Sequence, residues 1–137
     1  MRLYNTYGKL VNKNVSKYLI DWDGKSRSNL QFKVKQFLKK YWENHLCYEE
    51  FPAFGSLLKV DLINLTLKIA VEVDGQQHNA MGWFHNNSPA KYLAAIKNDI
   101  KKDAWLEKND FQLVRINYDE VDKLSPAFFK EKFDITL

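Results

Sequence analysis

The sequence predicts a mixed α/β fold in which one β-sheet packs against helices. Two observations support this prediction. Three short runs of β-forming residues follow one another with brief turns between them, and segments with helical spacing of apolar residues flank these runs. The expected order is α-β-β-β-α-β, followed by a short helix. We expect one domain over residues 1–137, with an N-terminal arm or hairpin (1–27), a core (28–121) and a C-terminal helix (122–137).

The first helix is expected from Ser28 to His45. Its apolar residues recur at helical spacing: Leu30, Val34, Phe37, Leu38, Tyr41 and Trp42. Ser28 suits the N-cap position, because its hydroxyl can accept a hydrogen bond from a free backbone N–H of the first turn. The preceding 27 residues are rich in turn formers, which predicts either a small hairpin or an arm wrapped around the core.

Three strands are expected next, over Leu46–Phe51, Leu57–Ile63 and Lys68–Asp74. Pro52 and Gly55 separate the first two strands, and the short turn NLT joins the second to the third. Links this short favour antiparallel neighbours, because a parallel pair needs a long crossover connection.

The remaining elements are two helices and a strand. A second helix is expected from Pro89 to about Asn109, since proline suits the first helical turn. Its apolar seam is formed by three residues: Leu93, Ile96 and Ile100. A fourth strand is expected over Phe111–Tyr118. The last helix opens with Ser125 as its cap and Pro126 at its first position.

Composition narrows the class of protein. Of 137 residues, 45% are hydrophobic and 15% aromatic, which is enough for a packed core. The single cysteine, Cys47, excludes an internal disulfide and fits a reducing compartment. No apolar run reaches membrane-spanning length and no signal peptide is evident, so no membrane partner and a cytoplasmic location are expected. The formal charge of +4 is compatible with a polyanionic partner.

The stretch KIAVEVDGQQH, residues 68–78, places two carboxylates in a strand. Glu72 and Asp74 should point the same way, because residues two apart in a strand share a face. Asp61 interrupts the preceding strand, and a tight turn would bring it beside them. Burying like charges costs roughly several kcal/mol each, so a bound Mg²⁺ or Mn²⁺ is expected to offset their repulsion. These three residues are therefore the predicted metal ligands.

Residues near this cluster suggest hydrolysis of a phosphodiester. A divalent metal can polarise a phosphate and lower the pKa of a water. His78 follows the strand and can exchange a proton near neutral pH. Asp99, from the second helix, could orient His78 or hold a water in the outer shell of the metal. Five lysines are the expected phosphate contacts: Lys33, Lys35, Lys59, Lys97 and Lys101.

The same residues have alternative structural roles. Asp61 could be a strand-end or edge carboxylate paired with a lysine. Glu72 and Asp74 could lie on an exposed face of the sheet, and His78 could be a loop histidine bonded to backbone. Each residue alone is weak evidence, whereas the ordered set is much stronger.

Alternatives also exist for the second helix and for the loop before it. Asp99 and Asp103 could pair locally with Lys101 and Lys102. Three loop residues could insert among DNA bases or pack under their own domain: Trp83, Phe84 and His85. A zinc site is disfavoured, because paired ligand spacing is missing among the four candidates, His45, Cys47, His78 and His85.

The segments VDL, IAVEVDGQQH, ND and KKDAWLEKNDFQLVRI resemble the PD-(D/E)xK nuclease superfamily. The similarity is to its very-short-patch-repair-like branch, and especially to phage-encoded homing endonucleases whose motif is abbreviated E-D-x-H-D. It runs from about Asp23 to Val121, and WDGKSRS, EEFP and EVDGQQH are its most specific parts. The resemblance implies a restriction-endonuclease-like core that cuts DNA with a divalent metal. The expected location is the cytoplasm, including that of a phage-infected host.

The resemblance also implies roles for single residues. The motif aspartate corresponds to Asp61, its histidine to His78 and its final aspartate to Asp99. The first motif member is a glutamate in the first helix, and the matching residue here is Gln31. Glutamine cannot bind a metal or relay protons as glutamate does, although it can orient a water.

A second departure concerns the lysine of the superfamily's ExK motif, because Asp74 occupies that position here. His78, Gln76 or Gln77 would have to take the role of that lysine.

The sequence therefore predicts a Mg²⁺-dependent endonuclease of the homing type acting on double-stranded DNA. The alternatives are a mismatch-directed repair nickase and a catalytically silent DNA-binding module.

Two further expectations concern assembly. Many nucleases cut both strands as two-fold dimers, so a homodimer is expected for a double-strand cut. No helix-turn-helix or zinc-finger module is evident, so sequence recognition could reside in a separate region.

Overall fold

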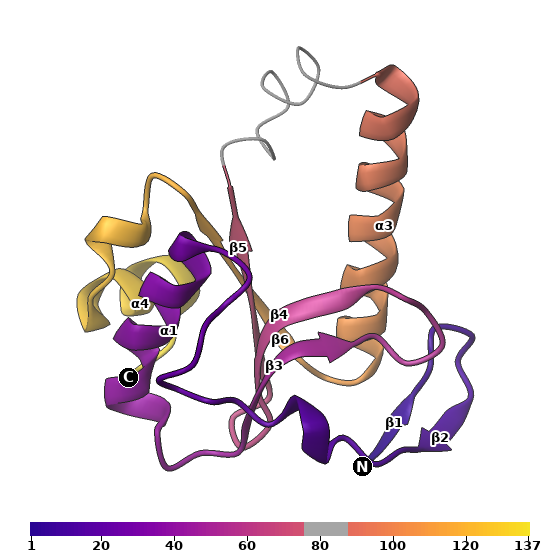
Figure 1. Ribbon diagram of the computed structural model, residues 1–137, viewed down its shortest axis with the longest axis horizontal. Coiled ribbons are helices and arrows are strands. Elements are labelled where there is room, and N and C mark those ends of the chain that lie inside the picture. Colours follow the sequence, from indigo (N-terminus) through magenta and orange to yellow (C-terminus); the bar gives the residue numbers. More distant parts are fainter. Residues whose placement is uncertain (76–87) are drawn as a thin grey trace.

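The computed structural model describes residues 1–75 and 88–137 (Figure 1). Its strands are β1 (Arg2–Tyr4), β2 (Leu10–Asn12), β3 (Cys47–Pro52), β4 (Lys59–Asn64), β5 (Ile69–Asp74) and β6 (Gln112–Asn117). Its helices are α1 (Asn29–Trp42), α3 (Pro89–Lys108) and α4 (Pro126–Phe133), with 3₁₀ turns η1 (Ser16–Tyr18) and η3 (Val121–Lys123). In the described residues the chain is mixed α/β, and the predicted order from α1 to α4 is confirmed.

The main sheet has four strands in the order β3-β4-β5-β6. Strands β3, β4 and β5 are antiparallel neighbours, as their short connections predicted. Strand β6 runs parallel to β5, with Glu72 opposite Arg115 and Asp74 opposite Asn117. Helix α3 lies in the connection between these two strands, which gives the long crossover that a parallel pair requires.

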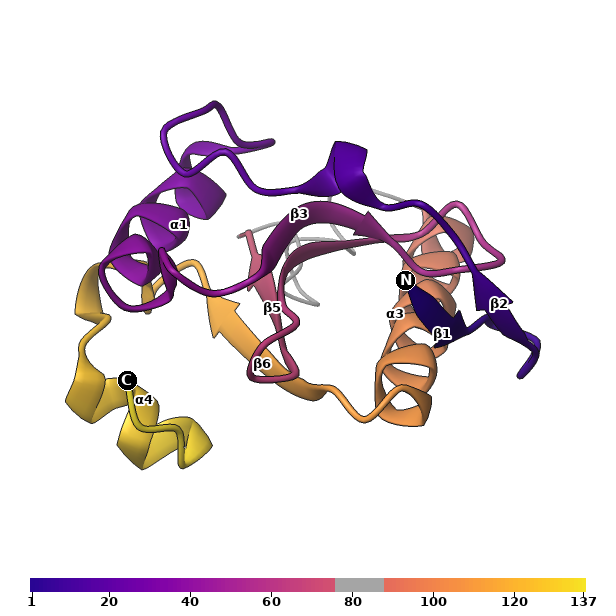
Figure 2. The ribbon, with the colours of Figure 1, turned by 90° about the horizontal axis from the view of Figure 1, so that it is seen from below.

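Helices cover both faces of this sheet. Figure 2 shows α1 and α4 on one side, and α3 with the β1–β2 hairpin on the other. In β5, Val71 and Val73 belong to the core under α1 and α4, whereas Ala70 belongs to the core that contains Trp105 of α3. Because side chains alternate along a strand, Glu72 points toward α3. Glu72 is therefore buried under α3, whereas Asp74, at the end of β5, is only partly buried.

Local signals set the helix ends. The Ser28 hydroxyl accepts a hydrogen bond from the Gln31 backbone N–H at 3.1 Å, which confirms the predicted N-cap of α1. Ser125 caps α4 in the same way, accepting from the Phe128 N–H. Helix α1 ends at Trp42, before the predicted end at His45, because the His45 N–H bonds to the Trp42 carbonyl in a tight turn.

The predicted apolar seam of α3 is wrong as a core seam. Leu93, Ile96 and Ile100 are 64%, 39% and 63% exposed, and the buried residues of the helix are Trp105 and Leu106. The N-terminal half of α3, which carries Leu93 and Ile96, extends past strands β3 and β4 (Figure 1), whereas Ile100 lies in the C-terminal half and is still exposed. Helical periodicity identifies an apolar stripe, but it does not show which part of the stripe meets the core.

The N-terminal residues form a hairpin, one of the two expected arrangements. Strands β1 and β2 pair antiparallel, with Leu3 opposite Val11. The hairpin is fixed to α3 through Trp105, whose indole N–H donates to the Tyr4 carbonyl at 2.7 Å. Across the described ranges, the helices are all too short or too polar to cross a membrane.

Candidate functional site

A cavity of about 330 Å³ lies between β4, β5 and α3. It brings together all four acidic residues that the sequence singled out and that the structure describes, which are Asp61, Glu72, Asp74 and Asp99. Its full lining is Arg27, Glu50, Lys59, Asp61, Glu72, Val73, Asp74, Asp99, Lys102 and Arg115. Five of these side chains are acidic and four are basic, so the cavity is strongly polar and nearly balanced in charge.

Asp61 of β4 and Glu72 of β5 form the buried part of this site. Both residues are only 4% exposed. The Asp61 Oδ2 atom accepts a hydrogen bond from the Val73 backbone N–H at 2.8 Å, which fixes the carboxyl against β5. The alternative of an exposed sheet face is therefore wrong for Glu72. The alternative of an edge position is wrong for Asp61, because β4 lies between two strands.

The surroundings of Asp61 favour the neutral form of its carboxyl. Burial, and then the negative charge of Glu72, raise the pKa of Asp61 to about 8. The Val73 N–H and the positive charge of Arg27 act in the opposite direction without cancelling this shift. Without a bound cation, the Asp61 carboxyl therefore keeps its proton at neutral pH.

A distortion of β3 and β4 shapes the wall of the cavity. Tyr48 and Phe51 of β3 enter the same core although they are three residues apart, where regular alternation allows only even spacing. Glu50 between them has φ of 52°, a left-handed conformation that few non-glycine residues adopt. It places the Glu50 side chain at the cavity next to Asp61, on the neighbouring strand.

Each predicted metal ligand has a basic partner. Lys102 Nζ lies 2.6 Å from Glu72 Oε1, and Arg27 Nη2 lies 3.2 Å from Asp61 Oδ1. Arg115 Nη1 lies 3.5 Å from Asp74 Oδ1. These partners come from α3, from the segment before α1 and from β6.

The residues fit a hard divalent cation at Asp61 and Glu72. Magnesium is commonly bound by one or two carboxylates together with waters and substrate phosphate oxygens. Repulsion within the buried pair is what a divalent cation would remove. No larger group of histidine, cysteine or acidic side chains suited to a metal occurs within residues 1–75 and 88–137. The described residues therefore bring Asp61 and Glu72 together as a pair, but Asp74 does not join them in a three-residue group.

Gln31 acts on the site through another residue. It is fully buried and does not line the cavity. Its Nε2 atom donates to Glu49 Oε2 at 2.9 Å and to Glu50 Oε1 at 3.1 Å. A glutamate here would face two other carboxylates, whereas the amide supplies the donor that they need. This contact is a physical reason for glutamine at this position.

Lys35 was expected to contact phosphate, and this prediction is wrong. Its side chain is 0% exposed. The ammonium lies 3.0 Å from Glu49 Oε1 and also donates to the carbonyls of Asp21 and Gly24. Lys35 therefore anchors the turn before α1 and cannot reach a ligand. The other four predicted phosphate contacts are at least partly exposed, namely Lys33, Lys59, Lys97 and Lys101.

Several predicted residues lie outside the described ranges, and their roles stay predictions: Gln76, Gln77, His78, Trp83, Phe84 and His85.

Local pairing on α3 occurs in one case, since Asp99 Oδ1 lies 3.9 Å from Lys102 Nζ. Asp103 instead contacts Arg115 of β6, at 3.0 Å.

The described candidates for zinc ligands have other roles. His45 Nδ1 lies 2.9 Å from the Asn64 side-chain amide. Cys47 is buried, and this burial raises the pKa of its thiol to about 12, so it is not a thiolate at neutral pH.

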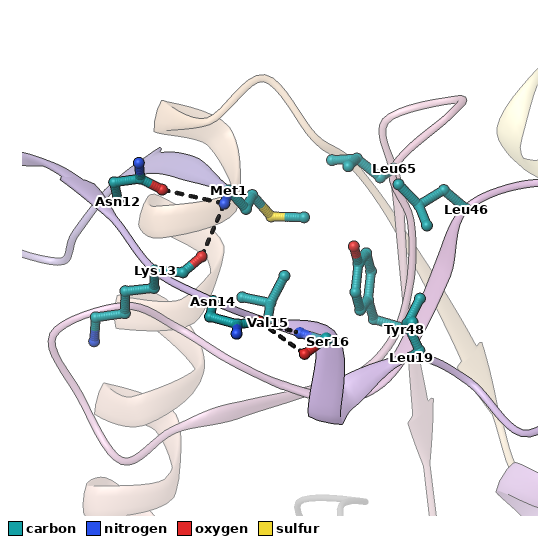
Figure 3. Close-up of a pocket in the computed structure, with 10 residues that line it drawn as sticks. All are labelled: Met1, Asn12, Lys13, Asn14, Val15, Ser16, Leu19, Leu46, Tyr48 and Leu65. Carbon is teal, nitrogen blue, oxygen red and sulfur yellow. Dashed lines mark hydrogen bonds between the residues drawn. The ribbon is translucent and has the colours of Figure 1, made fainter.

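A larger cavity, of about 760 Å³, lies between the N-terminal hairpin, η1 and β3 (Figure 3). Its wall is formed largely by apolar side chains such as Val15, Leu19 and Tyr48. Burial raises the pKa of the Tyr48 hydroxyl, which keeps it protonated. The residues described in its lining include no acidic side chain, histidine or cysteine, so we place the chemistry in the smaller cavity.

Sequence reasoning missed four residues of the site: Arg27, Glu50, Lys102 and Arg115. The segments WDGKSRS and EEFP did carry a signal, because they contain Arg27 and Glu50. Lys102 and Arg115 lie in the resembling segment KKDAWLEKNDFQLVRI, but their contacts with Glu72 and Asp74 depend on how α3 and β6 pack. Comparison with known proteins adds no family, because no protein-family model, curated protein or solved structure matches the chain.

Proposed function

We propose that this chain is a divalent-metal-dependent endonuclease that hydrolyses phosphodiester bonds of double-stranded DNA. The observation that carries the proposal is the Asp61–Glu72 pair, which is buried, adjacent and set in the wall of a cavity with basic side chains around it. Such a pair is costly unless its charge is offset, and a divalent cation held there both offsets the charge and can act on a phosphate. The resemblance to homing endonucleases with a restriction-endonuclease-like core is part of this proposal.

The proposed mechanism assigns a role to each group. Asp61 and Glu72 would hold Mg²⁺ or Mn²⁺, which supplies charge stabilisation at the scissile phosphate and a more acidic water. His78 accepts a proton from the attacking water or donates one to the leaving oxygen. Asp99 orients His78 or a water bound at the site. Arg27, whose side chain is 57% exposed, can turn from Asp61 to a phosphate oxygen.

The proposed DNA contacts beyond the cavity are electrostatic. Lys59 lines the cavity itself, and Lys97 and Lys101 are exposed on α3. Lysines at such positions hold the phosphate backbone without reading its sequence. Two-fold pairing of this chain, needed for a concerted double-strand cut, belongs to the same proposal.

A second candidate function is DNA binding without cleavage. The observation that favours it is that Asp61, Glu72 and Asp74 are all paired with basic side chains. If these pairs persist in the presence of metal, the site is silent. The protein would then show salt-dependent DNA binding without hydrolysis.

Incubation with supercoiled plasmid distinguishes the two functions. We expect nicked or linear product with Mg²⁺ or Mn²⁺ and none with EDTA. Asp61→Asn should abolish the product, whereas Asp122→Asn should not, because the Asp122 side chain is 87% exposed and remote from the cavity. Binding without cleavage in either metal would refute the nuclease in favour of the silent module. Nicks confined to a mismatched duplex would instead indicate a repair nickase.

A further inference from the structure

The Lys102 ammonium occupies a cation position built from protein oxygens. Its Nζ atom lies 2.6 Å from Glu72 Oε1 on β5, 3.3 Å from the Lys59 carbonyl oxygen on β4 and 3.9 Å from Asp99 Oδ1 on α3. The side chain is 15% exposed. Three separate elements thus supply oxygens to one positive charge inside the cavity.

The same oxygens would be needed by a divalent cation. Glu72 is one of the two carboxylates that fit a metal, and its Oε1 atom is in contact with Lys102. An ammonium and a divalent cation at this position repel each other, and the repulsion is strong because a partly buried site is weakly screened. Lys102 and the metal therefore cannot both contact Glu72 favourably.

The other basic residues of the cavity are less suited to this competition. The Arg27 side chain is largely exposed and can move into solvent without leaving its loop. Arg115 is shared between Asp74 and Asp103, so it already has two anionic partners away from the Asp61–Glu72 pair. Lys102 makes the shortest contact and is the most enclosed of the three.

We propose that Lys102 is an internal counterion of the site that competes with the divalent metal for Glu72. The inference rests on the proposed function, because it assumes that Asp61 and Glu72 bind metal. In the metal-free protein, the ammonium offsets the charge of the carboxylate pair. When the metal binds, the flexible side chain leaves Glu72 and remains at the cavity wall, where the DNA phosphate is the nearest new anion.

This role gives one substitution two opposite effects. Lys102→Met removes the competitor, so the DNA-free protein should bind Mn²⁺ about tenfold more tightly. It also removes the cation that moves to the phosphate, so cleavage at saturating Mn²⁺ should fall about tenfold or more. A purely structural lysine would not improve metal binding when it is lost.

The experiment is calorimetric titration of Mn²⁺ into DNA-free protein, with plasmid cleavage measured on the same preparations. The variants are Lys102→Met, Lys102→Gln and, as a control on the same helix, Lys91→Met, whose lysine is exposed and outside the cavity. Lys102→Gln keeps a neutral donor near Glu72, so it tests the charge even if the methionine variant folds poorly. We expect tighter Mn²⁺ binding for both Lys102 variants and unchanged binding for the control.

The outcomes separate this inference from the proposed function. If the wild-type protein binds Mn²⁺ and cuts DNA but neither Lys102 variant binds Mn²⁺ more tightly, the counterion role is refuted and the nuclease stands. If the Lys102 variants gain affinity and no protein cuts DNA, the counterion role stands and the nuclease is refuted. If no variant binds Mn²⁺ at all, both are refuted.

Discussion

The buried carboxyl of Asp61 should make the metal-free protein less stable as the pH rises. Its pKa is raised from 3.8 to about 8, first by burial and then by Glu72. Asp61 ionises near its usual pKa in the unfolded chain but keeps a proton in the folded protein until the pH approaches 8. The unfolded state therefore gains relative stability throughout this interval. Asp61→Asn removes the ionisation while preserving an oxygen for the Val73 N–H. The free energy of unfolding of this variant should therefore rise relative to that of wild type over the same pH range.

The magnitude follows from the pKa shift. One pH unit within the interval changes the free energy of unfolding by at most about 1.4 kcal/mol per proton, so pH 5 to pH 8 gives a ceiling of about 4 kcal/mol. The Val73 N–H and the charge of Arg27 both favour the ionised form of Asp61 in the folded protein, so the full ceiling is not reached. We therefore expect the advantage of Asp61→Asn over wild type to grow by about 2 kcal/mol between pH 5 and pH 8.

The assay is urea unfolding in EDTA at several pH values between 5 and 8.5. The quantity compared is the difference between wild type and variant at each pH, because it isolates the effect of the Asp61 carboxyl. Asp122→Asn is the matched control, since it replaces an exposed aspartate and should track wild type at every pH. Added Mg²⁺ at pH 8 should stabilise wild type and leave Asp61→Asn unchanged, because the variant lacks one of the two proposed ligands.

One result would refute this reasoning. If Asp61→Asn and wild type differ by the same free energy at pH 5 and pH 8, Asp61 is ionised in the folded protein throughout. The pair would then be neutralised by Arg27 and Lys102 alone, and no divalent cation would be needed to explain its burial.

Two further predictions concern the surroundings of the site. Gln31→Glu should lower the free energy of unfolding at pH 7 by about 1–3 kcal/mol, because it replaces a buried donor with a third acceptor beside Glu49 and Glu50; unfolding unchanged in urea would contradict the donor role. Combined Lys97→Ala and Lys101→Ala should reduce the slope of log binding constant against log salt by about 2. Fluorescence anisotropy with labelled duplex measures that slope, and an unaltered slope would remove both lysines from the DNA interface.

Local patterns predicted most of the secondary structure because their physical causes are local. The hydroxyls of Ser28 and Ser125 reach backbone N–H groups three residues away, so a cap is visible in a short window of sequence. The short turn between β4 and β5 fixed their antiparallel pairing in the same way.

Burial was harder to predict than secondary structure. Lys35 and Ile100 are both on helices, yet the lysine is buried and the isoleucine is 63% exposed. The difference depends on what packs against each helix. The turn at Asp21–Gly24 closes over Lys35 and offers it carbonyl oxygens. Ile100 stays exposed even though its neighbours Asp99 and Lys102 line the cavity beside the sheet. Neither the burial of Lys35 nor the exposure of Ile100 can be predicted from residue type and spacing.

The sequence by itself indicated that Asp61 would lie beside Glu72 or Asp74, because a two-residue period and a short turn place these carboxylates on neighbouring strands. Only the tertiary structure decided their electrostatic state. Arg27 reaches Asp61 from 34 residues away, and Lys102 reaches Glu72 from 30 residues away. The physical reason is the sequence distance over which each effect acts. Strand geometry depends on residues close together in the sequence. Burial and charge neutralisation depend on distant segments that meet only when helices cover both faces of the sheet.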